Sequence, residues 1–203
     1  MNLYVITGTT KGLGRALAAQ VAARADDFLV SLSRGDETAS ARAVAVRVDL
    51  ADAAAIESAW DRVERAIAGK AFDKAVLVNN AGVVAPVGPL HDVDAAELAR
   101  NIAVNVTAPL LLMRRFLRAT ANVPVRRVIN ISSGAGRRAI AGWSAYCAAK
   151  AALDMASRVV ALEARGVEVV SLAPGVIDTP MQELVRGASE AQFADVERFR
   201  AMK

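Results

Sequence analysis

A glycine-rich segment near the N-terminus indicates the fold of this chain: Thr7-Gly8-Thr9-Thr10-Lys11-Gly12-Leu13-Gly14. It follows a short apolar run at residues 3–7 and opens a helical pattern over residues 13–24. Glycines at such a turn allow a tight bend and let the backbone approach a pyrophosphate, which the helix N-terminus attracts. The spacing is G-x-x-x-G-x-G rather than G-x-G-x-x-G. We predict a dinucleotide-binding turn here, the alternative being an ordinary strand-to-helix turn.

Outward from this turn, short apolar segments alternate with longer helical patterns. The strand candidates are residues 3–7, 28–33, 43–49, 75–79, 127–132 and 167–173, and most are continuously apolar, as strands buried on both faces are. The helix candidates are residues 13–24, 53–68, 95–120 and 144–165, with Asp52 and Asp94 as N-caps and Gly166 as a stop. This alternation predicts an α/β fold, a Rossmann-type doubly wound parallel sheet in a single domain over residues 1–203.

Composition limits the classes of function. The 203 residues suit one core, 54% of them are hydrophobic, and the net charge of +4 comes from scattered residues, so no nucleic-acid partner is expected. Cys147 is the only cysteine and His91 the only histidine, which argues against a disulfide, a metal site and a Ser-His-Asp triad. The N-terminus resembles no signal peptide and no apolar stretch reaches membrane-spanning length, so we expect a cytoplasmic protein without a membrane partner.

Two cations point to the form of the cofactor. The second strand ends in Ser33-Arg34, where an acidic residue would bind a ribose 2′-hydroxyl, and Lys11 lies inside the glycine turn. Each cation alone is also explained as a solvated surface charge. Placed together, they would clamp a 2′-phosphate, so we predict NADPH.

Polar residues at the ends of the next two strands extend this site. Asp49-Leu50 ends the third strand, where a carboxylate can accept from an adenine amino group or simply cap a turn. Asn80, Ala81 and Gly82 follow the fourth strand, where α/β sheets bind ligands. Their alternative is an ordinary Asn/Gly loop.

The chemistry is predicted from Tyr146 and Lys150, which share one face of a helix because they are four residues apart. A nearby ammonium stabilises a phenolate and so lowers a tyrosine pKa. Ser133 ends a strand 13 residues before Tyr146, where its hydroxyl can polarise a substrate carbonyl. Asn105, within a long predicted helix, needs partners for its amide, and a water chain to Lys150 would provide them.

Over nearly its whole length the chain resembles the short-chain dehydrogenase/reductase family, in the order and spacing of the glycine turn, residues 79–82, Asn105, Ser133, Tyr146, Lys150 and Pro174-Gly175. The resemblance implies a catalytic tetrad of Asn105, Ser133, Tyr146 and Lys150. Tyr146 would protonate a carbonyl oxygen while NADPH delivers hydride. The Ile177 backbone and the Thr179 hydroxyl would hold the nicotinamide amide. A homodimer or homotetramer is implied as well.

Residues 142–150 and 174–182 are similar to sepiapterin reductases and bacterial benzil reductases, members that reduce vicinal dicarbonyl compounds. Trp143 and Met181 would then line the substrate pocket, although Trp143 also suits a subunit interface. The family continues after the sixth strand to a further helix and strand. Residues 178–203 supply only a substrate loop and a helix, so we expect the fold to lack the last strand.

Two other readings stay open. A 3-oxoacyl-carrier-protein reductase would need a basic docking surface, for which Arg126-Arg127 and Arg137-Arg138 are candidates, although solvated charges explain them as well. A non-catalytic dinucleotide-sensing protein is disfavoured because a sensor needs no joint Tyr146 and Lys150.

Overall fold

The computed structural model describes residues 1–36 and 38–202. A seven-stranded sheet in the order β3-β4-β2-β1-β5-β6-β7 forms its centre. The strands are β1 (Asn2–Thr7), β2 (Asp27–Ser33), β3 (Thr38–Ala39), β4 (Ala43–Arg47), β5 (Lys74–Asn79), β6 (Val125–Ile131) and β7 (Val167–Leu172). Six of them are parallel, which confirms the predicted sheet. The two-residue β3 pairs antiparallel with β4 and was not predicted.

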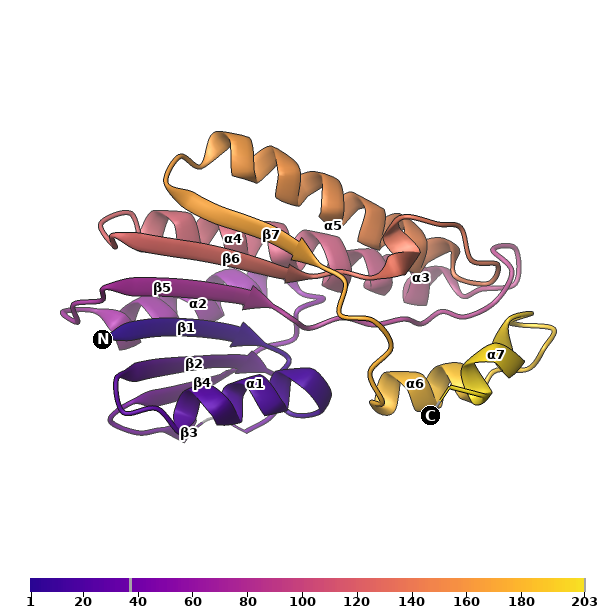
Figure 1. Cartoon of the computed structure of the whole chain (residues 1–203), viewed down its shortest axis with the longest axis horizontal. Coiled ribbons are helices and arrows are strands. Elements are labelled where there is room, and N and C mark those ends of the chain that lie inside the picture. Colours follow the sequence, from indigo (N-terminus) through magenta and orange to yellow (C-terminus); the bar gives the residue numbers. More distant parts are fainter. Residues whose placement is uncertain (37, 203) are drawn as a thin grey trace.

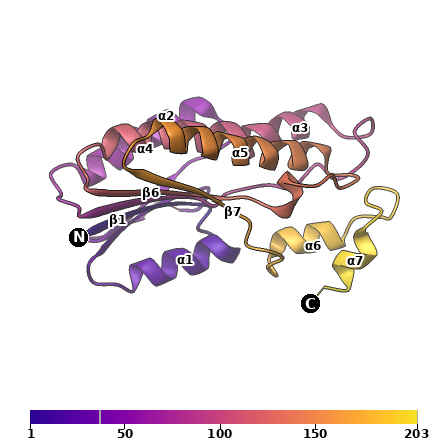
Figure 2. The same cartoon turned by 45° about the horizontal axis from the view of Figure 1, so that its top comes forward.

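Helices lie on both faces of the sheet (Figures 1 and 2). One face carries α1 (Gly12–Ala22), and the other carries α2 (Ala53–Ile67), α3 (Ala95–Ile102), α4 (Ala108–Ala119) and α5 (Ser144–Glu163). Two further helices, α6 (Pro180–Arg186) and α7 (Val196–Arg200), follow β7 beyond the carboxyl ends of the strands. The fold is the predicted doubly wound Rossmann-type architecture.

The alternation of side chains along β1 separates two apolar cores. Leu3 and Val5 pack in the cluster that contains Trp60 of α2 and Phe116 of α4. Ile6 points to the opposite face and packs with residues of α1. Because both faces of the strand are covered, its sequence is apolar at nearly every position.

The predicted helix ends are confirmed where a side chain caps them. Asp52 accepts from the Ala54 and Ala55 N–H groups, and Asp94 accepts from the Glu97 N–H. Gly166 follows α5 with a φ of +76°, a value that glycine adopts without steric cost.

The helix predicted over residues 95–120 is confirmed as one helical run, but it is not a regular α-helix throughout. A π-helical turn, Ala103–Thr107, separates α3 from α4, and Asn105 lies in it. Such single-turn insertions are frequent at functional sites, and the apolar pattern does not reveal them because it stays helical on either side.

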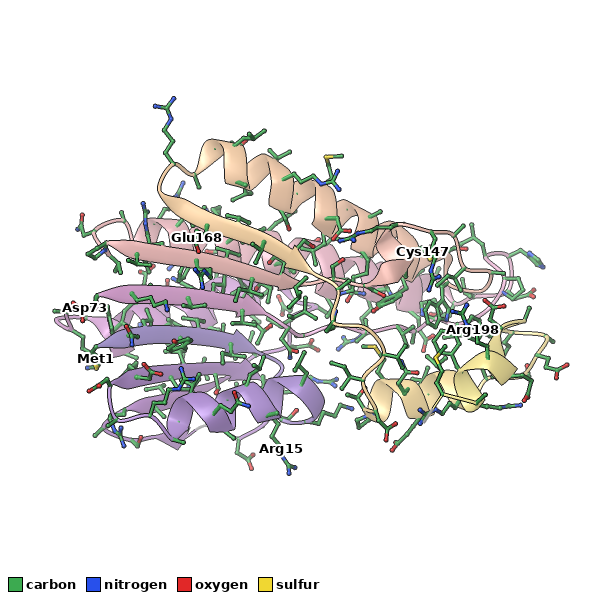
Figure 3. The ribbon with its side chains drawn as sticks, in the orientation of Figure 1. Met1, Arg15, Asp73, Cys147, Glu168 and Arg198 are labelled. Carbon is green, nitrogen blue, oxygen red and sulfur yellow. The ribbon has the colours of Figure 1, made fainter. Side chains whose placement is uncertain are left out.

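Different groups lie at the amino ends and at the carboxyl ends of the parallel strands. At the amino ends of the strands the Met1 ammonium donates to the Asp73 carboxylate at 2.6 Å. Figure 3 labels both residues at this end of the sheet. At the carboxyl ends lie the glycine turn and the segments that enter α5 and α6. Parallel α/β sheets bind their ligands at the carboxyl ends of the strands. Among the described residues, no helix is both long and apolar enough to cross a membrane.

Candidate active site

One cleft runs along the carboxyl ends of the strands and gathers nearly all of the predicted site residues. Its lining includes Gly8, Thr10, Lys11, Gly12, Leu13, Gly14, Ser33, Arg34, Asp49, Leu50, Asn80, Ala81, Gly82, Ser133, Trp143, Tyr146, Lys150, Pro174, Gly175, Ile177, Thr179 and Met181. Asn105 is the exception, because it is buried behind the cleft. The structure thus places the predicted residues together, while their roles stay predictions.

The glycine turn has the shape that a close backbone approach requires. Gly8 and Gly12 have φ values of +70° and +56°. A Cβ on Gly14 would lie 2.2 Å from the carbonyl oxygen of Gly8, so only glycine fits where α1 starts under the turn. A Cβ on Gly12 would lie 3.1 Å from the Thr179 methyl group, which shows how closely the segment after β7 approaches the turn.

Thr7 fixes the turn to the segment after β5, a role that sequence reasoning missed. Its Oγ1 accepts from the Asn80 and Ala81 N–H groups, both at 2.9 Å. In return, the Asn80 side-chain amide donates to the Thr7 carbonyl at 2.9 Å. A threonine at the end of an otherwise apolar strand was the available signal.

The predicted adenosine end of the cleft carries cations. Lys11 and Arg34 are both exposed there, from the glycine turn and from the end of β2. Ser33 accepts from the Gly35 N–H at 3.2 Å. Both cations can therefore meet an anionic group from two elements, and Arg34 also attracts the Asp49 carboxylate.

Asp49 has a partner that the sequence did not indicate. One nitrogen of the Arg100 guanidinium, on α3, donates to both of its carboxylate oxygens at 3.1 Å. The Ala51 N–H and Arg100 hold the pKa of the Asp49 carboxyl below its ordinary value. The carboxylate is therefore charged at neutral pH. It accepts from Arg100 and also lines the cleft.

Tyr146 and Lys150 form the centre of the cleft. The Lys150 ammonium lies 5.6 Å from the centroid of the Tyr146 ring and donates to the Ile131 carbonyl at 2.8 Å. Burial raises the pKa of Tyr146, and the neighbouring Ser133 side chain opposes that rise. Burial lowers the pKa of Lys150 to about 8, against an attraction from Asp154 that raises it. The pair is thus held inside the protein rather than on a helix surface.

Ser133 is held by the turn that follows it. Its Oγ accepts from the Ala135 N–H at 3.2 Å and so caps a 3₁₀ turn, Gly134–Gly136. A Cβ on Gly136 would lie 2.9 Å from the carbonyl carbon of Lys150. Because Gly136 has no side chain, the turn that holds Ser133 packs directly on the backbone of α5.

The Asn105 side chain makes its direct hydrogen bonds to the Val83 backbone and to Asn101. It donates to the Val83 carbonyl at 2.8 Å and accepts from the Val83 N–H at 3.1 Å. It also donates to Asn101, a fully buried residue that sequence reasoning missed. A Cβ on Gly82 would lie 3.0 Å from the Asn105 oxygen and 3.5 Å from the Lys150 nitrogen, so Gly82 lies between the two side chains.

The other end of the cleft is apolar and aromatic. Trp143 is buried within the chain, stacks on Phe193 at 4.9 Å and meets the Tyr146 ring edge-on at 5.5 Å. Phe199 of α7 packs against the same indole. Residues 178–202, expected as a loop and one helix, contain two short helices that cover this end, and α6 contributes Met181.

The residues present fit a nicotinamide dinucleotide. A Cβ is excluded at Gly14, where a pyrophosphate would need backbone amides, and cations lie at the far end of the same cleft. The Tyr146–Lys150 pair lies where such a ligand would end, next to the apolar pocket. The site therefore has the parts of a dinucleotide-dependent oxidoreductase.

Comparison with known proteins agrees with this class. Residues 2–190 match the family model for short chain dehydrogenase. The chain belongs to the short-chain dehydrogenase family, whose members use nicotinamide dinucleotide cofactors.

The chain is also similar to individual members of this family. The chain is 36% identical to the benzil reductase ((S)-benzoin forming) of Bacillus subtilis (strain 168), over 100% of this chain and 85% of that protein. It is 35% identical to the sepiapterin reductase of Rattus norvegicus, over 91% of this chain and 78% of that protein. A short-chain dehydrogenase/reductase structure from Burkholderia vietnamiensis is 37% identical, with a TM-score of 0.79, over 100% of this chain and 98% of that chain.

Proposed function

We propose that this protein is an NADPH-dependent carbonyl reductase in which Tyr146 is the proton donor. The observation that carries the proposal is the geometry around Tyr146. Its buried ring lies beside Ser133 and under the Lys150 ammonium, between the part of the cleft that the glycine turn lines and the apolar pocket.

The side chains divide the chemistry among them. The Tyr146 hydroxyl gives its proton to the carbonyl oxygen of the substrate, and the Ser133 hydroxyl donates a hydrogen bond to the same oxygen. The charged Lys150 stabilises the phenolate that forms. Asn105 orders the segment at Val83. A water path from Asn105 toward Lys150 would return the proton. A bound nicotinamide supplies the hydride.

Lys11 and Arg34 support NADPH over NADH. Both cations are exposed at the end of the cleft where the adenosine ribose of a dinucleotide would lie. They come from two different elements. A 2′-phosphate between them makes charge-assisted bonds with each. The Asp49 carboxylate, which also accepts from Arg100, would accept from the adenine amino group.

The apolar pocket supports a small ketone or vicinal diketone as substrate. Trp143 and Met181 form its walls, and Phe193 and Phe199 support the indole from behind. The related benzil and sepiapterin reductases agree with such a substrate class. The Ile177 backbone and the Thr179 hydroxyl, which both line the cleft, would hold the carboxamide of the nicotinamide.

The test is a panel of NADPH- and NADH-oxidation assays with benzil, with an acetoacetyl thioester and without substrate, for wild type and Tyr146→Phe. We expect turnover of benzil with NADPH, lowered by about 10²–10⁴-fold or more in Tyr146→Phe. NADPH binding, followed by fluorescence, stays unchanged because the ring is kept.

Each other outcome points to a different function. Preferred turnover of the thioester would favour a 3-oxoacyl-carrier-protein reductase. Tight NADPH binding without turnover of any carbonyl compound would favour a dinucleotide sensor. Near wild-type turnover in Tyr146→Phe would remove Tyr146 from the mechanism.

A further inference from the structure

Asp154 is a buried carboxylate that the proposed reaction does not use. It lies on α5 one helical turn after Lys150, and only 7% of the residue is exposed. Carboxylates are almost never buried to this degree unless they are paired. The groups that contact this carboxylate therefore indicate what it does.

Two segments besides α5 converge on this carboxylate. The Ser171 hydroxyl of β7 donates to its Oδ1. The Arg137 guanidinium, at the end of the turn that starts from Ser133, lies 3.8 Å from its Oδ2. Asp154 thus connects α5 to the strand that leads to Pro174 and to the turn that holds Ser133.

Asp154 is the carboxylate of α5 that is nearest to Lys150 in the sequence, four residues away on the same face of the helix. Residues four apart on a helix have Cβ atoms about 5–6 Å apart. Lys150 is 4% exposed, and its one hydrogen bond within the described residues goes to the neutral Ile131 carbonyl. A buried cation with a neutral partner is costly unless an opposite charge lies near it.

We propose that Asp154 is a positioning residue of this site, whose buried carboxylate supplies the counter-charge that keeps the Lys150 ammonium protonated and turned inward. The role rests on the proposed function, because it matters for catalysis only if Lys150 acts with Tyr146. It is consistent with Asp154 attracting the charge of Lys150 and raising its pKa against burial.

The other groups around the pair do not replace Asp154. Arg137 is a second cation near Asp154. Its side chain is 63% exposed, so solvent screens the attraction between Arg137 and Asp154. Arg158, one turn further along α5, is exposed. The π-helical turn presents Asn105, which is neutral, β6 presents a carbonyl, and β7 presents Ser171. Among the described residues that have been named, Tyr146 on α5 is the other titratable group beside Lys150.

The first test is the pH dependence of kcat/KM for benzil in two matched variants. Asp154→Asn removes the charge and keeps an oxygen that accepts from Ser171, whereas Ser171→Ala removes the hydrogen bond and keeps the charge. We expect the upper pH limit of kcat/KM to fall by about one pH unit in Asp154→Asn. In Ser171→Ala it stays where it is in wild type. An unchanged limit in Asp154→Asn, or equal shifts in both variants, would overturn the proposal.

The second test needs no cofactor or substrate. A double-mutant cycle of urea unfolding at pH 7 compares Asp154→Asn in wild type and in Lys150→Met. We expect the loss of stability to be smaller in the Lys150→Met background, with a coupling of about tenfold in the unfolding equilibrium constant. If Asp154→Asn alone does not fold, the double variant recovers folding, and additive effects or an unfolded double variant would count against the proposal. Because this cycle ignores turnover, it separates a failure of the Asp154 role from a failure of the proposed reaction.

Discussion

The buried charge of Lys150 has a measurable consequence for stability. Burial lowers its pKa to about 8 in the folded protein, whereas an unfolded lysine titrates near ~10.4. Between these values the unfolded chain binds more protons than the native protein, so the free energy of unfolding rises with pH. Below pH 8 both states are protonated, and the full cost of burying the charge remains.

The size of the effect follows from the two pKa values. The cost at neutral pH is about 3 kcal/mol, and about 2 kcal/mol of it is relieved between pH 7 and pH 9.5. Tyr146, whose pKa is raised, acts in the opposite direction only above about pH 10, where an unfolded tyrosine ionises. The window from pH 8 to pH 10 therefore reports on Lys150.

The assay is urea unfolding of the cofactor-free protein at pH 7 and pH 9.5, in wild type and Lys150→Met. We expect wild type to gain about 2 kcal/mol more than the variant over this range. Lys70→Met is the control, since Lys70 is exposed, and its stability should run parallel to wild type. Parallel curves for wild type and Lys150→Met would refute a buried, charged Lys150.

Three further predictions test other parts of the site. Gly136→Ala places a Cβ 2.9 Å from the Lys150 carbonyl carbon, so Ser133 shifts and kcat falls by about 10- to 100-fold. The control Gly134→Ala, whose Cβ meets nothing closer than 3.9 Å, should keep kcat, and equal rates in the two variants would remove the argument. Arg34→Asp should weaken NADPH by about tenfold or more in Kd and affect NADH much less, which fluorescence titration measures; equal use of both cofactors by wild type would contradict the assignment. The chain should form at least a homodimer, because the α5 side chains of Met155, Val159 and Leu162 are 56%, 43% and 84% exposed; light scattering that gives a monomer at micromolar concentration would count against it.

The sheet was predictable because burial on both faces leaves a clear mark on a strand. β1 packs Leu3 and Val5 toward one core and Ile6 toward the other, so the run is apolar throughout. The two-residue β3 has no such pattern, since a strand so short buries too little to require one. The π-helical turn at Asn105 escaped for a related reason, because one inserted residue hardly changes the apolar spacing of a long helix.

The pairs that orient the site were not predictable in the same way. Arg100 and Asp49 lie 51 residues apart, and Thr7 and Asn80 lie 73 apart. Each residue alone is an ordinary surface or strand-end residue, and only the folded sheet brings the partners together. Motif spacing identified the residues that line the cleft, whereas their contacts needed the structure.

The central side chains are held mainly by backbone atoms. Lys150 donates to a backbone carbonyl, Ser133 accepts from a backbone amide, and the Asn105 side chain exchanges two hydrogen bonds with Val83. A sequence names side chains but does not show which backbone groups they meet. It does show where a side chain is missing, and at the glycines Gly82 and Gly136 the backbone comes close to Lys150. Such glycines resemble ordinary turn residues in the sequence, yet in the structure they set the distances on which the proposed proton transfer depends.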